Sequence, residues 1–190
     1  MALSGSGRIV GPSTGDEQSG VVSVTRYATR FGSLESYEKG TLEIIDDDPK
    51  HYTYSNMFEV ASISKPYEKV AVGKNMEYVL EVLRAEGTSG WRTTAHDEFA
   101  IVMDGEVEVR LVKLEDPSVV APDQKGSIGL SGEPKGQNMG YVKAGKGHMV
   151  LLPTGAAYQF HADKPGVILL QTIESPDTVY KWAEICQTIP

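Results

Sequence analysis

The sequence predicts an all-β domain, folded as a jelly roll or small barrel, with a single helix at the C-terminus. Between Val21 and Ile173 most apolar segments are short, rich in β-branched residues and separated by polar turns. Asp104-Gly105 joins two of these segments, and a helical apolar period is found only after Asp177. Many short antiparallel strands followed by one helix are typical of β-sandwiches and closed barrels.

The composition indicates a cytoplasmic protein with one main domain. The 190 residues allow a substantial core, and 40% of them are apolar. The net charge of −8 and the lack of a basic cluster argue against nucleic acids and anionic membranes as partners. Cys186 is the only cysteine, which favours a reducing compartment, and we expect no secretory signal or membrane span.

Four parts are expected along the chain: a mobile Gly- and Ser-rich segment (1–20), N-terminal strands (21–75), a barrel core (76–174) and a C-terminal helix (175–190). The first part is described as mobile because nine of its twenty residues are Gly or Ser. The strands expected in the second part are VVSVT, TLEII, YTYS, MFEVAS and YEKVAV.

The core part opens with MEYVLEVLRA, in which Met76, Tyr78, Leu80 and Val82 alternate with other residues. This alternation predicts a strand whose face carrying these four side chains is buried. Further strands are expected at YVKA, HMVLL, AAYQFHA and VILLQTI, after a long polar loop from Glu115 to Gly140.

Asp104-Gly105 lies between FAIVM and EVEVRLVKL and predicts a hairpin with a type I′ turn. In the second of these strands Val107, Val109 and Leu111 alternate with charged residues, so they are expected to face the core.

The C-terminal segment has the apolar spacing of an amphipathic helix. Asp177 is the expected N-cap, and we expect the apolar face to pack on the barrel, with another chain as the alternative. The residues on that face are Val179, Trp182, Ala183 and Cys186.

Two motifs resemble those of the cupin barrels, over roughly residues 76–173. The first cupin motif has a His-x-His pair, then a Glu, then a Gly seven positions later, and Glu98 and Gly105 have this spacing. The second has Gly, five residues, Pro-x-Gly, two residues and His, and GHMVLLPTG (147–155) fits it up to the histidine. The resemblance implies a cupin-type jelly-roll barrel with an extended N-terminal arm.

The metal-ligand positions of these motifs are mostly occupied by other residues. With three residues before the glutamate, the two histidine positions fall on Arg92 and Thr94. With four, they fall on Trp91 and Thr93, and the last histidine position is Tyr158. Because arginine is a cation without a lone pair to donate, the sequence predicts a barrel that has lost its metal.

His96 leaves an alternative open, because it precedes Glu98 by two residues and both would point the same way on a strand. Together with His148 or His161 they would form a displaced metal site. The simpler interpretation is a histidine hydrogen-bonded in the core. Tyr158 is expected to fill the barrel, with its hydroxyl bonded to Glu98 or His96.

A closer resemblance is carried by YSNMFEVAS with PYEKVAVGKN, EYVLEVLRAEGTSGW, AHDEFAIVMDGEVEVRL, and GHMVLLPTGAAYQF with VILLQTI. These stretches resemble the small (α) subunit of hydroquinone 1,2-dioxygenases. The resemblance implies an α2β2 non-haem Fe(II) dioxygenase that opens hydroquinone with O2 to 4-hydroxymuconic semialdehyde. It also implies that Fe(II) is bound by the large (β) cupin subunit and that this chain alone has no metal, no catalytic residue and no activity.

Such a chain can still contribute to the substrate site. Trp91 follows the flexible-looking segment Gly87–Gly90, from which a flat aromatic side chain can close over a partner's pocket. Arg92 is the second candidate for substrate binding, or it forms an ion pair with Asp97 or Glu98. The alternative functions are a self-sufficient metallo-cupin and a ligand-binding cupin without catalysis.

Overall fold

The computed structural model describes residues 32–37 and 56–181. The chain divides into two units, and every described residue belongs to the second, Phe31–Pro190. Several expected features lie outside the described residues, namely the mobile segment 1–20, the strands at 21–25, 41–45 and 52–55, and the helical face from 182 onward with Cys186.

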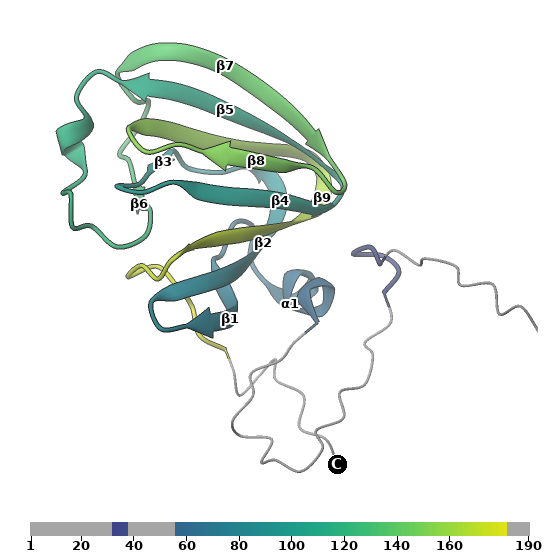
Figure 1. Ribbon diagram of the computed structural model, residues 1–190. Helices are drawn as coiled ribbons and strands as arrows, with labels where there is room; N and C mark the ends of the chain where they lie inside the picture. Colours follow the sequence, from purple (N-terminus) through teal and green to yellow (C-terminus); the bar gives the residue numbers. More distant parts are fainter. Residues whose placement is uncertain (1–31, 38–55, 182–190) are drawn as a thin grey trace, which may run out of the picture. The chain divides into compact units, whose positions relative to one another are not determined.

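The described part of the second unit is mostly a curled β-sheet, accompanied by one short helix (Figure 1). Its elements are α1 (Met57–Ile63), β1 (Val70–Asn75), β2 (Tyr78–Thr88), β3 (Arg92–Thr93), β4 (Glu98–Asp104), β5 (Glu106–Leu114), the 3-10 turn η2 (Pro117–Val119), β6 (Ile128–Gly129), β7 (Gly136–Gly145), β8 (Met149–Leu152) and β9 (Ala156–Ile173).

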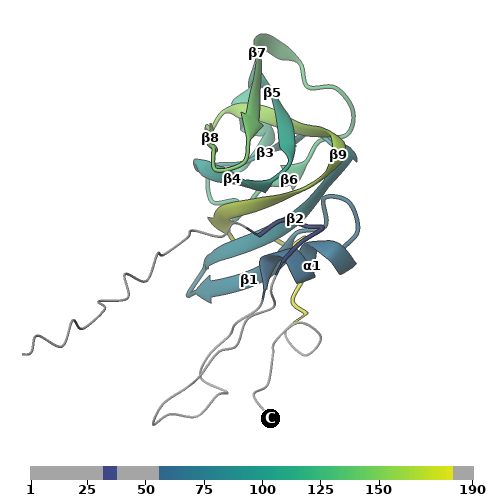
Figure 2. The same cartoon turned by 90° about the vertical axis from the view of Figure 1, so that its right-hand side faces the viewer.

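The long strand β9 joins the two halves of the sheet, because it pairs with four other strands. Residues 156–161 pair with β5, and residues 166–173 pair with β2 (Figure 2). The β2–β9 register shifts between these halves, next to Pro165, which has no amide hydrogen to donate. The expectation of two separate strands at AAYQFHA and VILLQTI was therefore wrong, since they form one strand with an irregularity.

The interior of the curled sheet holds aliphatic side chains and two aromatic rings, those of Tyr158 and Phe160. Val107 and Val109 are buried and Leu111 packs against them, as predicted for β5. The all-β jelly roll is confirmed. The buried members of this cluster are Leu83, Ala85, Ala100, Val102, Val107, Val109, Ala144, Val150, Leu152, Tyr158, Phe160, Ala162, Ile168 and Leu170.

The turn at Asp104-Gly105 is a corner between the two halves of the sheet and not a hairpin. Gly105 has a φ of +78°, but Asp104 does not have the positive φ that a type I′ turn requires. In the pairing of the strands, β4 lies beside β8 and β9, whereas β5 lies beside β7 and β9. A Cβ atom on Gly166 would lie 2.6 Å from the carbonyl oxygen of Asp104, so the corner also needs this second glycine.

The segment MFEVAS forms helix α1, so its prediction as a strand was wrong. The side chain of Asn56 caps this helix by accepting hydrogen bonds from the backbone N–H groups of Phe58 (3.0 Å) and Glu59 (3.3 Å). An N-cap asparagine stabilises the first turn of a helix because the amides there have no intrahelical partner. The helix packs Val60 and Ala61 against the outer side of β2 and β9.

Strand β2 is present as predicted, but with the opposite face in the barrel. Val79 and Glu81 point into the interior and are 2% and 0% exposed, whereas Tyr78 and Leu80 are 56% and 41% exposed. Val82 lies on the outer face with them and is buried beneath α1. Apolar residues on the two faces of this strand therefore made the alternation misleading.

The polar stretch from Glu115 to Gly140 is largely a loop, as predicted, although it contains η2 and the short strand β6, and its last five residues already belong to β7. The described part of the C-terminal segment is not helical, so the prediction that a helix begins at Asp177 was wrong. Val179 instead forms an isolated β-bridge with Val70, and Asp177 forms an ion pair with Arg92. Within residues 56–181, no helix combines the length and the apolar character of a membrane span.

Candidate functional site in the barrel

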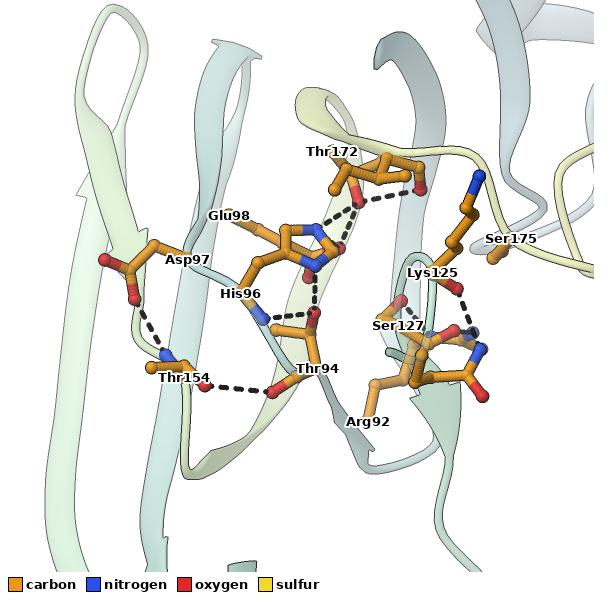
Figure 3. Close-up of polar contacts among 12 residues, drawn as sticks. Arg92, Thr94, His96, Asp97, Glu98, Lys125, Ser127, Thr154, Thr172 and Ser175 are labelled. Carbon is orange, nitrogen blue, oxygen red and sulfur yellow. Dashed lines mark hydrogen bonds and ion pairs between the residues drawn. The ribbon is translucent and has the colours of Figure 1, made fainter. Parts of the chain in front are cut away.

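Of the three motif glycines, Gly155 lies near the metal-ligand positions, because its neighbour Thr154 is bonded to Asp97. Gly105 and Gly147 lie at the other end of β4, where Gly147 donates to the Val102 carbonyl. Gly105, Gly147 and Gly155 have φ values of +78°, +85° and +74°, a conformation that side chains with a Cβ rarely adopt. Asp97 holds the turn before Gly155, because its carboxylate accepts a 2.8 Å hydrogen bond from the backbone N–H of Thr154 (Figure 3). Asp97 thus stabilises this turn and is not the partner of Arg92.

The carboxylate of Glu98 lies at the centre of a buried polar cluster. Tyr158 donates a 2.6 Å hydrogen bond to Oε2 of Glu98, and the hydroxyl of Thr172 donates to Oε1 (Figure 3 shows the Thr172 contact). Glu98 and Tyr158 are 0% and 1% exposed. Burial, followed by the charge of Glu98, raises the pKa of Tyr158 well above its usual value, while Ser127 and Arg92 oppose this shift.

His96 connects this cluster to the surface. Its Nε2 lies 3.3 Å from the hydroxyl of Thr172 and 4.0 Å from Oε1 of Glu98, and its Nδ1 lies 3.0 Å from the hydroxyl of Thr94 (Figure 3). A ring with its hydrogen on Nε2 satisfies all these groups: Thr94 donates to Nδ1, and Nε2 donates to Thr172. His96, Glu98 and Tyr158 therefore meet in one hydrogen-bonded cluster.

Arg92 is held at the same end of the barrel by two other segments. Its Nε donates to the hydroxyl of Ser127 (3.0 Å), and its Nη2 donates to the Ser127 carbonyl (2.8 Å) and to the carboxylate of Asp177 (2.7 Å). The pairing of Arg92 with Gly129 and Tyr158 places β3 between β6 and β9. The predicted pairing of Arg92 with Asp97 or Glu98 was wrong.

A second buried charge pair, Lys69 with Glu81, lies next to this region. The Lys69 ammonium is 3.1 Å from Oε2 of Glu81, and the two side chains are 3% and 0% exposed. Ser127 and Ser175 accept from the ammonium at 3.2 and 3.3 Å. Burial raises the pKa of Glu81, and the neighbouring Lys69 charge and the hydroxyl of Thr178 oppose the rise.

The residues at the cupin ligand positions do not fit a divalent metal. Tyr158 and Thr172 already donate hydrogen bonds to the two carboxylate oxygens of Glu98, and the Arg92 guanidinium brings positive charge to the same end. His148 and His161 lie elsewhere, bonded to the Gly145 carbonyl and to Thr88 with Asp163. Among the described residues, no three His, Cys, Asp or Glu side chains are grouped to hold a metal ion.

Trp91 is half-buried and lines two cavities at this end of the barrel. One has a volume of about 190 Å³ and reaches inward to Tyr158 and Phe160. The other, about 400 Å³, is an outer groove that also includes Arg110 and Tyr141. The backbone carbonyl of Trp91 accepts a 2.8 Å hydrogen bond from the N–H of Leu130, which fixes the residue beside β6.

The sequence did not indicate the partners that complete this site. Thr172, Ser127 and Asp177 are distant in sequence from the motif strand, and they belong to no motif. The Lys69–Glu81 pair was also missed, although a glutamate within the apolar run of β2 was a usable signal, since a buried carboxylate requires a partner.

Two solved structures are similar to this chain over most of its length. One is hydroquinone 1,2-dioxygenase PnpCD in complex with Cd2+ and 4-hydroxybenzonitrile, with 54% identity and a TM-score of 0.80 over 86% of this chain and 99% of that chain. The other is hydroquinone 1,2-dioxygenase from Sphingomonas sp. TTNP3 with 4-hydroxybenzoate bound, with 53% identity and a TM-score of 0.83 over 87% and 100%. No family model and no curated protein matches the sequence.

A third similarity is to a longer chain. PnpCD in complex with Fe3+ contains a chain that is 10% identical, with a TM-score of 0.55, and the match covers 74% of this chain but only 38% of that one. At this identity the similarity shows the fold alone.

The curled sheet, the left-handed motif glycines and the spacing of the two motifs define this protein as a cupin jelly roll. Within that class, the chain belongs to the hydroquinone 1,2-dioxygenase family, as its identity with two such enzymes over nearly their whole matched chains shows.

Proposed function

We propose that this chain is the non-metal small subunit of a hetero-oligomeric dioxygenase that opens hydroquinone with O2 to 4-hydroxymuconic semialdehyde. The main support is the identity of 53–54% that extends across 99–100% of the matched dioxygenase chains. In this reaction one ring C–C bond is broken and both oxygen atoms of O2 enter the product. Fe(II) held by a large cupin subunit supplies the O2 chemistry when it is bound.

The assignment of iron to the partner is supported by the chemistry of the barrel. The two oxygens of Glu98 already accept hydrogen bonds from Tyr158 and Thr172, so a metal would have to displace both donors. Such buried, satisfied hydrogen bonds are costly to break because the freed groups lose their partners. This also disfavours the alternative of a self-sufficient metallo-cupin using His96 and Glu98.

The large subunit is proposed to be a second cupin in an α2β2 assembly. Support comes from PnpCD, where a longer chain has the same fold as this one at 10% identity. The cytoplasm is the proposed location, because Cys186 is the only cysteine and reducing compartments keep thiols unpaired.

We place the contact with the large subunit on the outer face of β2, β9, β4 and β8. In the register of these strands Leu80, Gln171, Phe99 and Leu151 form one row across the sheet. Leu80 and Leu151 are 41% and 45% exposed, and Met149 on the neighbouring row is 62% exposed. A clustered apolar face of this kind is typical of protein interfaces.

Trp91 is proposed to complete the wall of the substrate site. Its ring lies between an inner cavity and an outer groove, so it can contact a flat substrate at the rim of the barrel. A planar aromatic side chain offers a large apolar surface and excludes water from a reacting ring. Hydrogen bonds hold the neighbouring Ser89 to Phe160 and Gln159 and the Trp91 carbonyl to Leu130, so the backbone fixes the ring at this rim.

Arg92 is proposed to act on this site by positioning Trp91. Its Nε and Nη2 atoms are used by Ser127 and Asp177, so the guanidinium ties β3 to the 126–130 loop and the C-terminal segment. Direct substrate binding by Arg92 is limited to its remaining nitrogen, Nη1.

The proposal is tested by reconstitution. The chain is purified alone and after co-expression with the large cupin chain, and O2 uptake and ring-opened product are measured with hydroquinone. We expect turnover only from the complex. Turnover at the same rate from this chain alone would contradict the proposal, and so would failure to form a complex in which ring cleavage is detected.

A further inference from the structure

The cavity of about 190 Å³ beside Tyr158 is a built aromatic chamber within this chain. The rings of Tyr67 and Phe160 lie nearly parallel, at 11° with centroids 6.3 Å apart, and Tyr158 is tilted against Phe160 with centroids 5.3 Å apart. The chamber is further lined by Trp91, Leu83 and Leu170. These walls suit a flat apolar ring and offer little to a flexible polar ligand.

The size of the chamber limits the ligand to a single ring. An apolar cavity of about 150 Å³ in another protein takes up benzene, so a volume of about 190 Å³ suits a benzene ring with a small substituent. Two fused rings with substituents would exceed it.

The polar end of the chamber determines what substituent the ring should carry. Lys69 and Arg92 both line the chamber, and both donate to the hydroxyl of Ser127. Glu81 and Asp177 balance their charges through ion pairs of 3.1 and 2.7 Å. A charge-balanced end favours a neutral ligand group over a free anion or a cation.

The remaining donor of Arg92, Nη1, indicates where the oxygen of a ligand would lie in the chamber. The hydrogen bonds of Arg92 to Ser127 and Asp177 use Nε and Nη2. Nη1 lies next to Gly129, where a Cβ atom would be 4.0 Å from it, and Gly129 lines the chamber. Nη1 is therefore placed to donate to a hydroxyl oxygen on a ring in the chamber.

We propose that this chamber binds one neutral monocyclic phenol, with its ring against Phe160 and Trp91 and its oxygen toward Arg92. Two residues at cupin ligand positions, Arg92 and Tyr158, line this ring-binding position. The inference goes beyond the proposed function, because it requires neither the large subunit nor iron.

The test is calorimetric titration of the full chain, purified alone, with phenol. We expect saturable binding of a single equivalent. Cyclohexanol carries the same hydroxyl on a puckered ring and is the matched probe, which should bind at least about tenfold more weakly. Absence of saturable binding of phenol, or equal binding of both alcohols, would overturn the proposal.

Two variants locate the binding in the chamber. Gly129→Leu and Gly90→Leu add a side chain at lining positions where a Cβ atom has nothing closer than 4.0 Å, so the fold should tolerate them. Gly145→Leu is the control, since it meets only an ordinary contact of 3.7 Å with His148 and lies outside the chamber. Each lining variant should weaken phenol binding by at least about tenfold, and the control should leave it unchanged.

Circular dichroism and the melting temperature identify variants that fold normally. If both lining variants fold and bind phenol like the unmodified chain, the chamber is not the site. Failure of the reconstituted complex to cleave hydroquinone would not affect this result, because phenol binding is measured on the chain alone.

Discussion

The hydroxyl of Tyr158 donates a 2.6 Å hydrogen bond to Oε2 of Glu98 in the buried interior of the barrel. These are two positions at which the cupin motifs place metal ligands. The side-chain ring of Tyr158 fills the space beside Glu98, and its hydroxyl donates to one carboxylate oxygen of Glu98, while the Thr172 hydroxyl donates to the other. The end of the barrel is thus stabilised by hydrogen bonds between side chains.

Removing that hydroxyl should destabilise the protein. Tyr158→Phe leaves Oε2 of Glu98 buried without its donor, which costs about 1–3 kcal/mol, or more if the carboxylate is charged. The loss is measured as the change in the free energy of unfolding in urea. Tyr141→Phe is the control, because Tyr141 is 62% exposed and its change should stay within about 0.5 kcal/mol. Equal stabilities of the two variants would contradict the role of Tyr158.

The dependence of stability on pH should report the buried Glu81. Burial raises its pKa in the folded state above the usual value of 4.5, so the folded protein binds more protons than the unfolded chain above that pH. This contribution to stability is full below 4.5 and is lost as the pH rises through the raised pKa. The free energy of unfolding should therefore fall with rising pH relative to that of Glu81→Gln, in parallel denaturation series. A difference that stays constant or rises with pH from 4.5 upward would show that the pKa is not raised.

Trp91→Ala should weaken substrate binding in the assembled enzyme without preventing assembly. Loss of one aromatic contact predicts an increase in KM for hydroquinone of about three- to tenfold. Trp91→Phe keeps a ring at the rim and should show a smaller increase. Steady-state kinetics on complexes of matched subunit content provide the measurement, and an unchanged KM in the alanine variant would remove Trp91 from the substrate site.

Leu151→Lys should weaken association with the large subunit. The substitution places a charge next to Phe99 at the β8 end of this row, and burying an unpaired charge at an interface is unfavourable. Val119→Lys is the control, because Val119 is 49% exposed on η2, away from this face. Co-purification followed by size-exclusion chromatography should show less complex for Leu151→Lys only. Equal yields of complex would place the interface elsewhere.

Much of the fold could be predicted from local patterns. The alternation in β5 has one apolar face and one charged face, so its buried side was correctly assigned. β2 has apolar residues on both faces. The outer face carries Val82, which α1 covers, and the inner face also carries Glu81, which is paired with Lys69. Periodicity alone could not choose between these faces. The start of α1 was missed although Asn56 is a favourable N-cap, since the segment is short and also suits a strand.

The site was predictable where the motif spacing determined it, and not where distant residues met. The motif spacing identified Glu98 and Tyr158, and the hydrogen bond from Tyr158 to Glu98 is present. His96 was expected beside Glu98 because two residues on a strand point the same way. The partner of Arg92 was wrong, because Asp177 is 85 positions away and reaches the guanidinium only through the folded C-terminal segment. Pairings of that kind depend on the tertiary structure and leave no local pattern.

The central claim is that this chain is a cupin whose own barrel has exchanged its metal for side-chain hydrogen bonds. It is tested most directly by the elemental content of Fe, Mn and Zn in the chain purified alone. We predict a metal content near zero, with no increase after incubation with Fe(II) under anaerobic conditions and desalting. A stoichiometric metal ion that is lost in His96→Ala would contradict the claim, because it would make His96 and Glu98 ligands of a working centre.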